Sequence, residues 1–318
     1  MLRNSQPTRR EVLTWGAAAL AAGTCLNHLA AEEKGTADID FLDAIDAHVH
    51  VWTSDIKSYP PAAGVDPQTM QPAHFTPEDL FQHTRPAGVD RIVLIQMSYY
   101  KNDNRYMLDT LAKSPEVFRA VAQIDEDRTD LRDAILKHVG DGVRGYRLWT
   151  TAESIARWDS SAGMQNMWKI GAETNMKMCL LANPDTLPAI FRWCRKYPET
   201  PVVIDHMARI GMTGTIRQSD VENLCRLSEC GNVYVKTSAF YALGAKKPPY
   251  TDLGPLIRKL RDSFGASRLM WASDCPFQVE QGHSYAASIN LIKSGLDFLS
   301  KSDRRWMLRD TAEKVFFS

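Results

Sequence analysis

Four side chains in this sequence have the chemistry to bind a metal ion or to move a proton. His48 and His50 are separated by one residue, while His206 and Asp274 each follow an apolar run. Side chains two residues apart on an extended strand share a face, so the two histidines of the pair point the same way. Two imidazoles can close on one metal ion, and a carboxylate can ligate that ion or take a proton from water. The set predicts either a metal centre or a metal-free polar pocket.

Each of these signals also has a plain structural explanation. A lone histidine at a strand end, such as His206, is more often a hydrogen-bonded core residue than a functional one. Asp274 stands two residues before Pro276 and would fit a turn or a helix N-cap. The functional interpretation therefore depends on whether the fold brings these residues together.

Cations near these stretches could hold a substrate carboxylate or polarise a carbonyl. Arg209 lies just after one apolar run and could bind a carboxylate through two hydrogen bonds. Arg144 and Arg147 are three residues apart on one predicted strand, and a regular strand cannot turn both inward. We assign the substrate to Arg144, keep Arg147 as the alternative, and note that a structural ion pair explains either. Lys236, at a predicted strand end, and Trp52 complete the candidate substrate-binding residues.

From Asp40 onward, short apolar runs alternate with amphipathic stretches, the pattern of strands that alternate with helices. The predicted strands cover residues 42–48, 91–96, 118–124, 142–148, 177–181, 202–205, 233–236 and 269–272. The predicted helices cover residues 77–86, 104–112, 131–139, 185–196, 220–230, 252–264, 284–299 and 303–315. Thr76 before Pro77, and glycines after three of the helical runs, supply caps.

Eight strands joined by helices imply parallel pairing with right-handed crossovers. An open doubly wound sheet could be drawn from the same alternation, but it usually carries a glycine-rich phosphate loop after its first strand. Histidines stand at that place in this chain. We therefore predict an α/β fold, a single-domain (β/α)8 TIM barrel over residues 40–318.

Such a barrel gives the candidate residues one common location. Active sites of (β/α)8 barrels lie at the C-terminal ends of the strands, where the sequence puts all four side chains. We predict that His48, His50 and Asp274 are the ligands of any metal ion, and that Asp274 and His206 are catalytic. Two longer loops leave the same ends as candidate substrate lids, over residues 52–75 and 238–251.

The first 31 residues resemble an export signal. Arg9 and Arg10 precede a short alanine-rich run, as in twin-arginine signals, although Val12 stands where that motif prefers an aromatic residue. We predict a signal peptide over residues 1–31, cleaved near Ala31, then a linker over residues 32–39 and a periplasmic or otherwise exported protein. The apolar run is short for a membrane span, and an N-terminal helix docked on the domain is the alternative.

Composition favours a small-molecule partner. The 318 residues include 38 Lys and Arg against 38 Asp and Glu, with no charged block. This balance argues against nucleic acid or an anionic membrane surface as a partner, and no stable membrane partner is expected after cleavage. Oligomerisation stays open. Of the six cysteines, Cys25 lies in the leader and the other five are scattered, which predicts free thiols and no disulfide framework.

Several stretches resemble the amidohydrolase-related family of metal-dependent hydrolases, and they are most similar to its lactonases. They occur in family order along the chain: IDAHVHVW (45–52), GVRGYRL (142–148), VIDHMAR (203–209), NVYVKTSAFY (232–241) and WASDCPF (271–277). By this resemblance, His48 and His50 match the first-strand pair, His206 the sixth-strand histidine and Asp274 the eighth-strand aspartate. Arg144 and Arg209 match positions that bind a substrate carboxylate or carbonyl.

The chain also departs from the family pattern. Relatives that hold zinc tightly usually have a histidine at the end of strand five, and residues 176–183 contain none. Cys275 stands where a tryptophan is common. The resemblance implies a divalent metal, zinc first, while a metal-independent mechanism stays open.

These features predict a hydrolase that opens a small cyclic ester, or cleaves a related C–O or C–N bond, by direct attack of water. Asp274 would be the general base; without a metal ion, His206, Arg144 and Arg209 would stabilise the oxyanion. The sequence has no G-x-S-x-G nucleophile motif. The alternatives are a non-oxidative decarboxylase of a small aromatic or unsaturated acid on the same scaffold, and an inactive barrel with a binding role.

Overall fold

A computed structural model of the chain describes residues 43–318 as eight parallel strands in one sheet, ordered from β1 to β8. The strands are β1 (Ala44–Val49), β2 (Val89–Ile95), β3 (Phe118–Ala122), β4 (Val143–Thr150), β5 (Lys177–Ala182), β6 (Val202–Ile204), β7 (Val233–Thr237) and β8 (Leu269–Trp271). The predicted leader over residues 1–31 and the linker over residues 32–39 lie outside the described residues.

The first and last strands meet through the segments that carry the candidate site. The Asp274 backbone N–H donates to the His48 carbonyl (2.9 Å), and the His50 N–H donates to the Cys275 carbonyl (2.9 Å). A parallel bridge joins Val49 to Cys275 between them. These bonds close the sheet into a barrel, so the predicted (β/α)8 architecture is confirmed.

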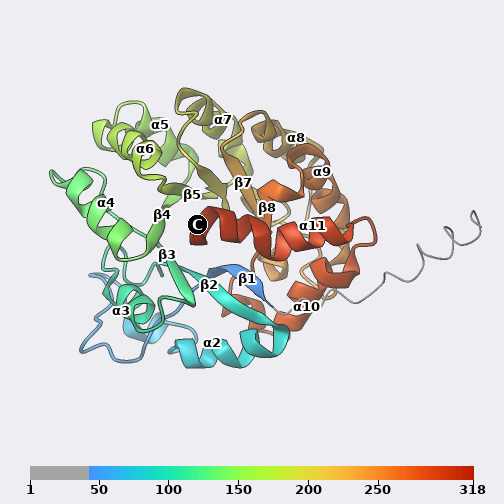
Figure 1. Cartoon of the computed structure of the whole chain (residues 1–318), viewed down its shortest axis with the longest axis horizontal. Coiled ribbons are helices and arrows are strands. Elements are labelled where there is room, and N and C mark those ends of the chain that lie inside the picture. The colour runs from blue at the N-terminus through green and yellow to red at the C-terminus, as the bar shows by residue number, and fades with distance from the viewer. Residues whose placement is uncertain (1–42) are drawn as a thin grey trace, which may run out of the picture. The chain divides into compact units, whose positions relative to one another are not determined.

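Helices surround the strands, which Figure 1 views end-on. They are α2 (Pro77–Thr84), α3 (Arg105–Lys113), α4 (Leu131–Gly140), α5 (Ala152–Trp158), α6 (Ala162–Thr174), α7 (Leu187–Lys196), α8 (Gln218–Arg226), α9 (Gly254–Phe264), α10 (Tyr285–Asn290) and α11 (Lys301–Arg305). The Thr76 hydroxyl accepts from the Asp79 N–H, which confirms the predicted cap of α2. The pair α5 and α6, between β4 and β5, was not among the predicted helices.

The C-terminal segment fills one end of the barrel. Ala312, Val315 and Phe316 pack among the apolar side chains that point into the barrel from the strands, and Figure 1 shows this segment crossing the ring of strands. Arg91, near the start of β2, makes a bidentate ion pair with Glu313 (2.8 and 2.7 Å). The segment therefore covers the N-terminal ends of the strands and leaves the C-terminal ends for a site.

No described helix is long and apolar enough to cross a membrane. Within residues 43–318 the five cysteines are free, as the scattered spacing predicts.

Candidate active site

The predicted histidine pair meets the predicted aspartate at the mouth of the barrel. His48 Nε2 and His50 Nε2 lie 3.3 Å apart, and Asp274 Oδ1 lies 3.5 and 3.4 Å from them. All three residues are buried. The β1–β2 register shifts between Asp46 and Val49, so strict alternation along β1 stops where the pair begins. The prediction that strand ends far apart in the sequence form one site is therefore confirmed in geometry.

Unusual backbone at the end of β6 brings the fourth residue to this group. His206, Met207, Ala208 and Arg209 all have positive φ, between 50° and 56°, a left-handed conformation that costs roughly 1–2 kcal/mol for each residue with a Cβ. Such strain persists only where the surrounding packing enforces it, and it is concentrated at functional sites. The His206 ring centroid lies 4.4 Å from that of His48.

The two oxygens of Asp274 face different neighbours. Oδ2 accepts a 2.7 Å hydrogen bond from the hydroxyl of Tyr241 and lies 3.8 Å from His206 Nε2, whereas Oδ1 faces His48 and His50. Burial alone would raise the pKa of Asp274, but the three imidazoles around it hold that pKa below its ordinary value. The carboxylate is therefore ionised at neutral pH and can accept a proton.

A buried ion pair lies beneath His48. Lys236 Nζ is 3.0 Å from Asp205 Oδ1 and 3.1 Å from His48 Nδ1, and all three residues are fully buried. Burial and the nearby ammonium lower the pKa of His48 well below 6.5, so its ring is neutral. Burial would raise the pKa of Asp205, but Lys236 and His48 hold it well below its usual range. Lys236 therefore packs under the site and does not face substrate at the rim, which corrects the prediction.

The proton positions around the pair fit a bound cation. His50 Nδ1 donates to the Ile95 carbonyl (2.9 Å), so in a neutral ring Nε2 is an acceptor. Arg147 has only donors and lies 3.0 Å from His48 Nε2, which makes this nitrogen an acceptor too. Asp274 Oδ1 is buried and, within the described chain, has no hydrogen-bond donor. Two imidazole nitrogens and one carboxylate oxygen thus face one another, and the Arg147 guanidinium holds the place of a cation beside His48 Nε2.

These three ligand atoms lie within 4.8 Å of one another. Two imidazoles and one carboxylate suit a divalent transition metal, and three protein ligands leave a position open, as in catalytic zinc sites. The His50–Ile95 bond is the kind of outer contact that orients a metal-binding histidine. The residues present therefore fit a metal ion.

A cavity of about 300 Å³ opens above this group. Its lining residues are His50, Gln96, Met97, Ser98, Gln123, Arg147, Trp149 and Phe277. Arg209 lies at the same mouth, with its guanidinium carbon 5.7 Å from the centre of the Trp149 ring. We call this space the catalytic cavity; it brings Arg147 and the predicted metal ligand His50 to one surface.

The structure does not bring Arg144 to the site, so the choice between the two arginines was wrong. Arg144 is the second residue of β4, and its guanidinium donates to the carbonyls of Val139 and Val143 near the start of that strand. The β3–β4 register skips Arg144, pairing Ala120 with Val143 and Val121 with Gly145. Arg147, nearer the C-terminal end of β4, reaches His48 instead (3.0 Å), so only one of the two arginines lies at the site, as strand alternation requires.

Trp52 also has a structural place. It is fully buried, its indole N–H donates to the Pro72 carbonyl (2.8 Å), and it is not among the residues that line the catalytic cavity. It pairs with Phe75 through an antiparallel bridge. Trp52 therefore anchors the loop after β1 and does not contact substrate in this cavity.

Three contacts to the site were missed in the sequence. Tyr241 binds Asp274, the Ser238 hydroxyl lies 2.8 Å from His206 Nδ1, and Asp205 pairs with Lys236. Ser238 and Tyr241 both lie in NVYVKTSAFY, one of the stretches that carried the family resemblance. Ser238 directly follows β7, so its place at a strand end was a signal that the sequence offered, whereas Tyr241 lies further along the loop and only the resemblance pointed to it.

Comparisons with known proteins agree with this geometry. The family model described as Amidohydrolase matches residues 45–317. The chain is 29% identical over 243 residues to an L-fucono-1,5-lactonase from Burkholderia ambifaria, covering 75% of this chain and 82% of that protein. This relative is a lactonase by its name.

Two solved structures share the fold. One is an amidohydrolase from Burkholderia multivorans with bound zinc, with a TM-score of 0.72 and 18% identity, covering 86% of this chain and 99% of that one. The other is the 5-carboxyvanillate decarboxylase from Sphingomonas paucimobilis, with a TM-score of 0.61 and 13% identity over 87% and 99% of the two chains. The family match spans nearly all of residues 43–318 and bears out the predicted hydrolase class. The chain belongs to the amidohydrolase family.

Proposed function

We propose that this protein hydrolyses a small sugar-type lactone by direct attack of water, with Asp274 as the general base. One observation carries the proposal: the Asp274 carboxylate lies 3.4 Å from His50 Nε2, and His50 lines the catalytic cavity together with Arg147, which contacts His48. The similarity to an L-fucono-1,5-lactonase supports a sugar-type lactone as the substrate class.

The chemistry follows from these positions. Asp274 takes a proton from a water molecule, the water oxygen bonds to the lactone carbonyl carbon, and negative charge moves to the carbonyl oxygen. The guanidinium of Arg147 donates to this oxyanion, and a fixed cationic donor in a cavity with little water stabilises such charge strongly. The C–O bond of the ring then breaks, and the proton held by Asp274 passes to the leaving ring oxygen. The product is the open hydroxy acid.

His206 and Arg209 orient Asp274 and the substrate and take no part in the proton transfer. Burial lowers the pKa of His206, so its neutral ring can donate or accept a hydrogen bond beside Asp274 without adding a charge. Arg209 is a second cation at the mouth, suited to the substrate carbonyl or to the product carboxylate.

His48, His50 and Asp274 would hold a divalent metal ion, and we propose zinc. When bound, such an ion lowers the pKa of a coordinated water and polarises a carbonyl oxygen. Arg147 would then serve the substrate alone, since its contact with His48 Nε2 occupies the lone pair that the ion needs.

The test is turnover of a panel of aldonolactones and aromatic lactones by purified protein, followed as acid release above the spontaneous rate. Asp274→Asn should lose at least about 100-fold in kcat with an unchanged melting temperature, the range of a general base. Asp133→Asn, an exposed aspartate on α4, is the matched control and should behave as wild type. Activity lost in chelator and restored by zinc would support the metal site.

The same assay separates the alternatives. A decarboxylase would release carbon dioxide from aryl or unsaturated acids and leave lactones intact. An inactive binding barrel would turn over neither, and Asp274→Asn would then change nothing. Absence of acid release from every lactone would overturn the proposal.

We also propose that the protein is exported through its twin-arginine leader. Fractionation of cells that produce the full chain should find the mature protein outside the cytoplasm, and replacing Arg9 and Arg10 by Lys should retain it inside. Equal export of both forms would contradict this.

A further inference from the structure

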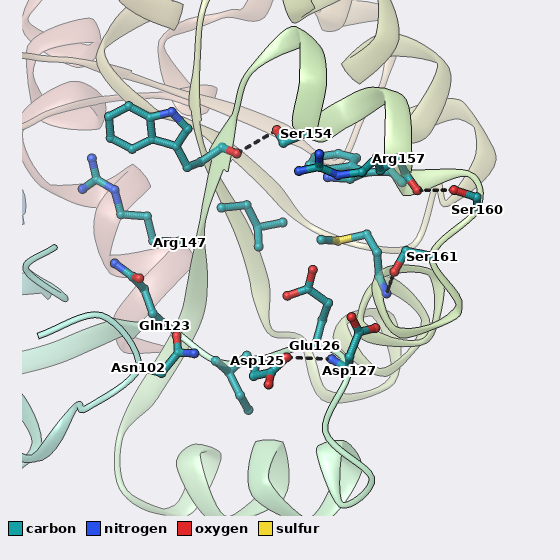
Figure 2. A pocket seen from close by; sticks show the side chains of 15 residues that line it. Asn102, Gln123, Asp125, Glu126, Asp127, Arg147, Ser154, Arg157, Ser160 and Ser161 are labelled. Atoms are coloured by element: carbon teal, nitrogen blue, oxygen red, sulfur yellow. Dashed lines mark hydrogen bonds between the residues drawn. The ribbon is translucent and has the colours of Figure 1, made fainter. Parts of the chain in front are cut away.

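A second cavity adjoins the catalytic cavity and is larger, at about 510 Å³. The two cavities are neighbours, because Gln123, Arg147 and Trp149 line both of them. We call the second cavity the polar annex. Figure 2 looks into it: Gln123 and Arg147, which also line the catalytic cavity, lie on one side, and Asp125, Glu126 and Asp127 lie along the lower wall.

The sizes of the two cavities argue for a substrate with two parts. Binding sites of enzymes usually enclose most of the ligand surface. The catalytic cavity, at about 300 Å³, is of a size for one small ring. A single-ring lactone would leave the annex filled with water, whereas a lactone with a second ring would occupy both spaces.

The charge of the annex argues against an anionic substituent. Asp125, Glu126 and Asp127 contribute three carboxylates. Arg157, on α5, is paired with Glu153 (2.7 Å), and the guanidinium of Arg147 points to His48 at the boundary with the catalytic cavity (3.0 Å). A carboxylate, sulfonate or phosphate beside these three carboxylates would face like charges, which oppose its binding.

The polar groups that remain available suit hydroxyls. The serines of the annex are engaged: Ser154 donates to the Trp149 carbonyl, Ser160 donates to the Arg157 carbonyl, and Ser161 accepts from a backbone N–H as the N-cap of α6. By contrast, the side chains of Gln123 and Glu126 make no hydrogen bond to another residue among 43–318. The Glu126 carboxylate can accept hydrogen bonds, and the Gln123 amide can both donate and accept them. Together they match neighbouring hydroxyl groups on a sugar ring.

An aromatic platform joins the two spaces. Trp149 is 59% exposed, unusually open for so large an apolar side chain, and the Arg209 guanidinium holds its ring from one side. An indole presents a broad apolar face with a polar edge, and the C–H face of a sugar ring packs well on such a surface.

We propose that the polar annex is a second subsite that binds a neutral polyhydroxylated substituent, such as a glycosyl group, attached to the lactone in the catalytic cavity. This rests on the proposed function and narrows its substrate class. The preferred substrate is then a glycosylated aldonolactone, with its lactone ring above His50 and its second ring between Trp149 and Glu126.

The experiment compares matched substrates. For the aldono-1,5-lactone that is hydrolysed fastest, kcat/KM is measured beside that of its β-glucosyl, glucosaminyl and glucuronosyl derivatives. The glucosyl derivative should be preferred over the bare lactone by at least about tenfold, the effect of 1.4 kcal/mol of added binding. A glucuronosyl preference, or a glucosaminyl derivative that exceeds the glucosyl one, would overturn a neutral subsite.

Substitutions in the polar annex test whether the preference for the glucosyl derivative arises there. Glu126→Ala and Ser160→Trp, which fills the annex, should each remove most of the glucosyl preference while changing kcat/KM for the bare lactone less than about twofold. Asp133→Asn is the control for loss of an exposed carboxylate. Retention of the full preference in both annex variants would refute the subsite.

A binding measurement keeps the subsite separate from turnover. Calorimetric titration of the Asp274→Asn variant with the glucosylated aldonic acid and with the bare acid tests the annex without catalysis. Tighter binding of the glucosylated acid by about tenfold supports the subsite even if no lactone is hydrolysed. Equal affinities, together with hydrolysis of bare lactones, would reject the subsite and leave the proposed function standing.

Discussion

The carboxylate of Asp274 is steered by a residue from a loop. The Tyr241 hydroxyl donates to Oδ2 at 2.7 Å, which leaves Oδ1 directed toward the imidazole pair. A hydrogen bond to a charged acceptor contributes about 1.5–3 kcal/mol. This contact fixes the oxygen that receives the proton.

Tyr241→Phe should therefore lower kcat/KM for lactone hydrolysis by about tenfold or more, because Asp274 loses both a donor and its orientation. The melting temperature should also fall by several degrees, because the buried carboxylate loses a hydrogen bond, so kcat/KM is compared well below melting. Tyr59→Phe is a matched control: its hydroxyl donates to Asp109 at 2.8 Å in an exposed pair, so its loss should leave kcat/KM unchanged. Equal effects of the two variants would contradict the steering role.

The two arginines of β4 show where residue-level prediction ends. The sequence put Arg144 and Arg147 on one strand, and strand periodicity allowed only one of them to face the barrel. The structure keeps this alternation, and the arginine that reaches the site is Arg147, whose guanidinium lies 3.0 Å from His48 Nε2. The distance along the strand, with the site at its C-terminal end, would have favoured Arg147.

Among the elements, β1 and β8 depend on a buried carboxyl group. Asp46 Oδ1 accepts from the backbone N–H of Ser273 (2.9 Å) and of His48 (3.2 Å), and Oδ2 accepts from the Tyr285 hydroxyl (2.8 Å). Asp46 thus ties β1 to β8 and to α10 just before the residues of the site. Burial raises its pKa to about 6 despite these donors.

This pKa predicts how the stability depends on pH. Because the folded-state pKa lies above the ordinary value of 3.8, the stabilising contribution of the neutral group is complete below about pH 4 and is lost as pH rises through about 6. The difference corresponds to up to about 3 kcal/mol. The asparagine of Asp46→Asn stays uncharged at every pH, so this variant does not lose the contribution that wild type loses. The free energy of unfolding of Asp46→Asn minus that of wild type should therefore increase between about pH 4 and pH 7.

Urea unfolding at both pH values measures this difference. Asp133→Asn, on the exposed face of α4, should show no comparable change. Asp46→Ala should be destabilised at both pH values, since two backbone N–H groups lose their acceptor. A difference between Asp46→Asn and wild type that stays constant with pH would contradict the assignment.

The strands and the residues at their ends could be predicted from the sequence, whereas contacts between elements could not. Each strand is an apolar run with a clear beginning and end, so the eight strands and the location of His48, His206 and Asp274 at their ends followed from periodicity. Lys236 was also found at a strand end, but its burial under His48 depends on a partner, Asp205, from another strand. Contacts made by loop residues such as Tyr241 have no period and could not be predicted.

At the scale of the whole molecule, the two ends of the barrel have separate tasks. The C-terminal ends of the strands carry the ionisable residues, and the N-terminal ends are closed by the last residues of the chain. In (β/α)8 barrels, side chains at the C-terminal ends of the strands serve catalysis, and those at the N-terminal ends serve stability. Phe316 is the largest side chain of the closing segment that is fully buried, and its ring centre lies 5.5 Å from Lys236 Nζ.

Phe316→Ala should therefore destabilise the fold by about 3–5 kcal/mol, the usual effect of emptying an aromatic core position. The melting temperature should fall by roughly 10 °C, while kcat/KM for a lactone, measured well below melting, should change less than about threefold. Phe317→Ala is the neighbouring control: its ring is only partly buried, against Arg91 and Arg119, and its loss should cost about 1 kcal/mol. A large fall in kcat/KM in the folded Phe316→Ala protein would mean that the closing segment supports Lys236 and His48 from below, and that the two ends of the barrel are coupled.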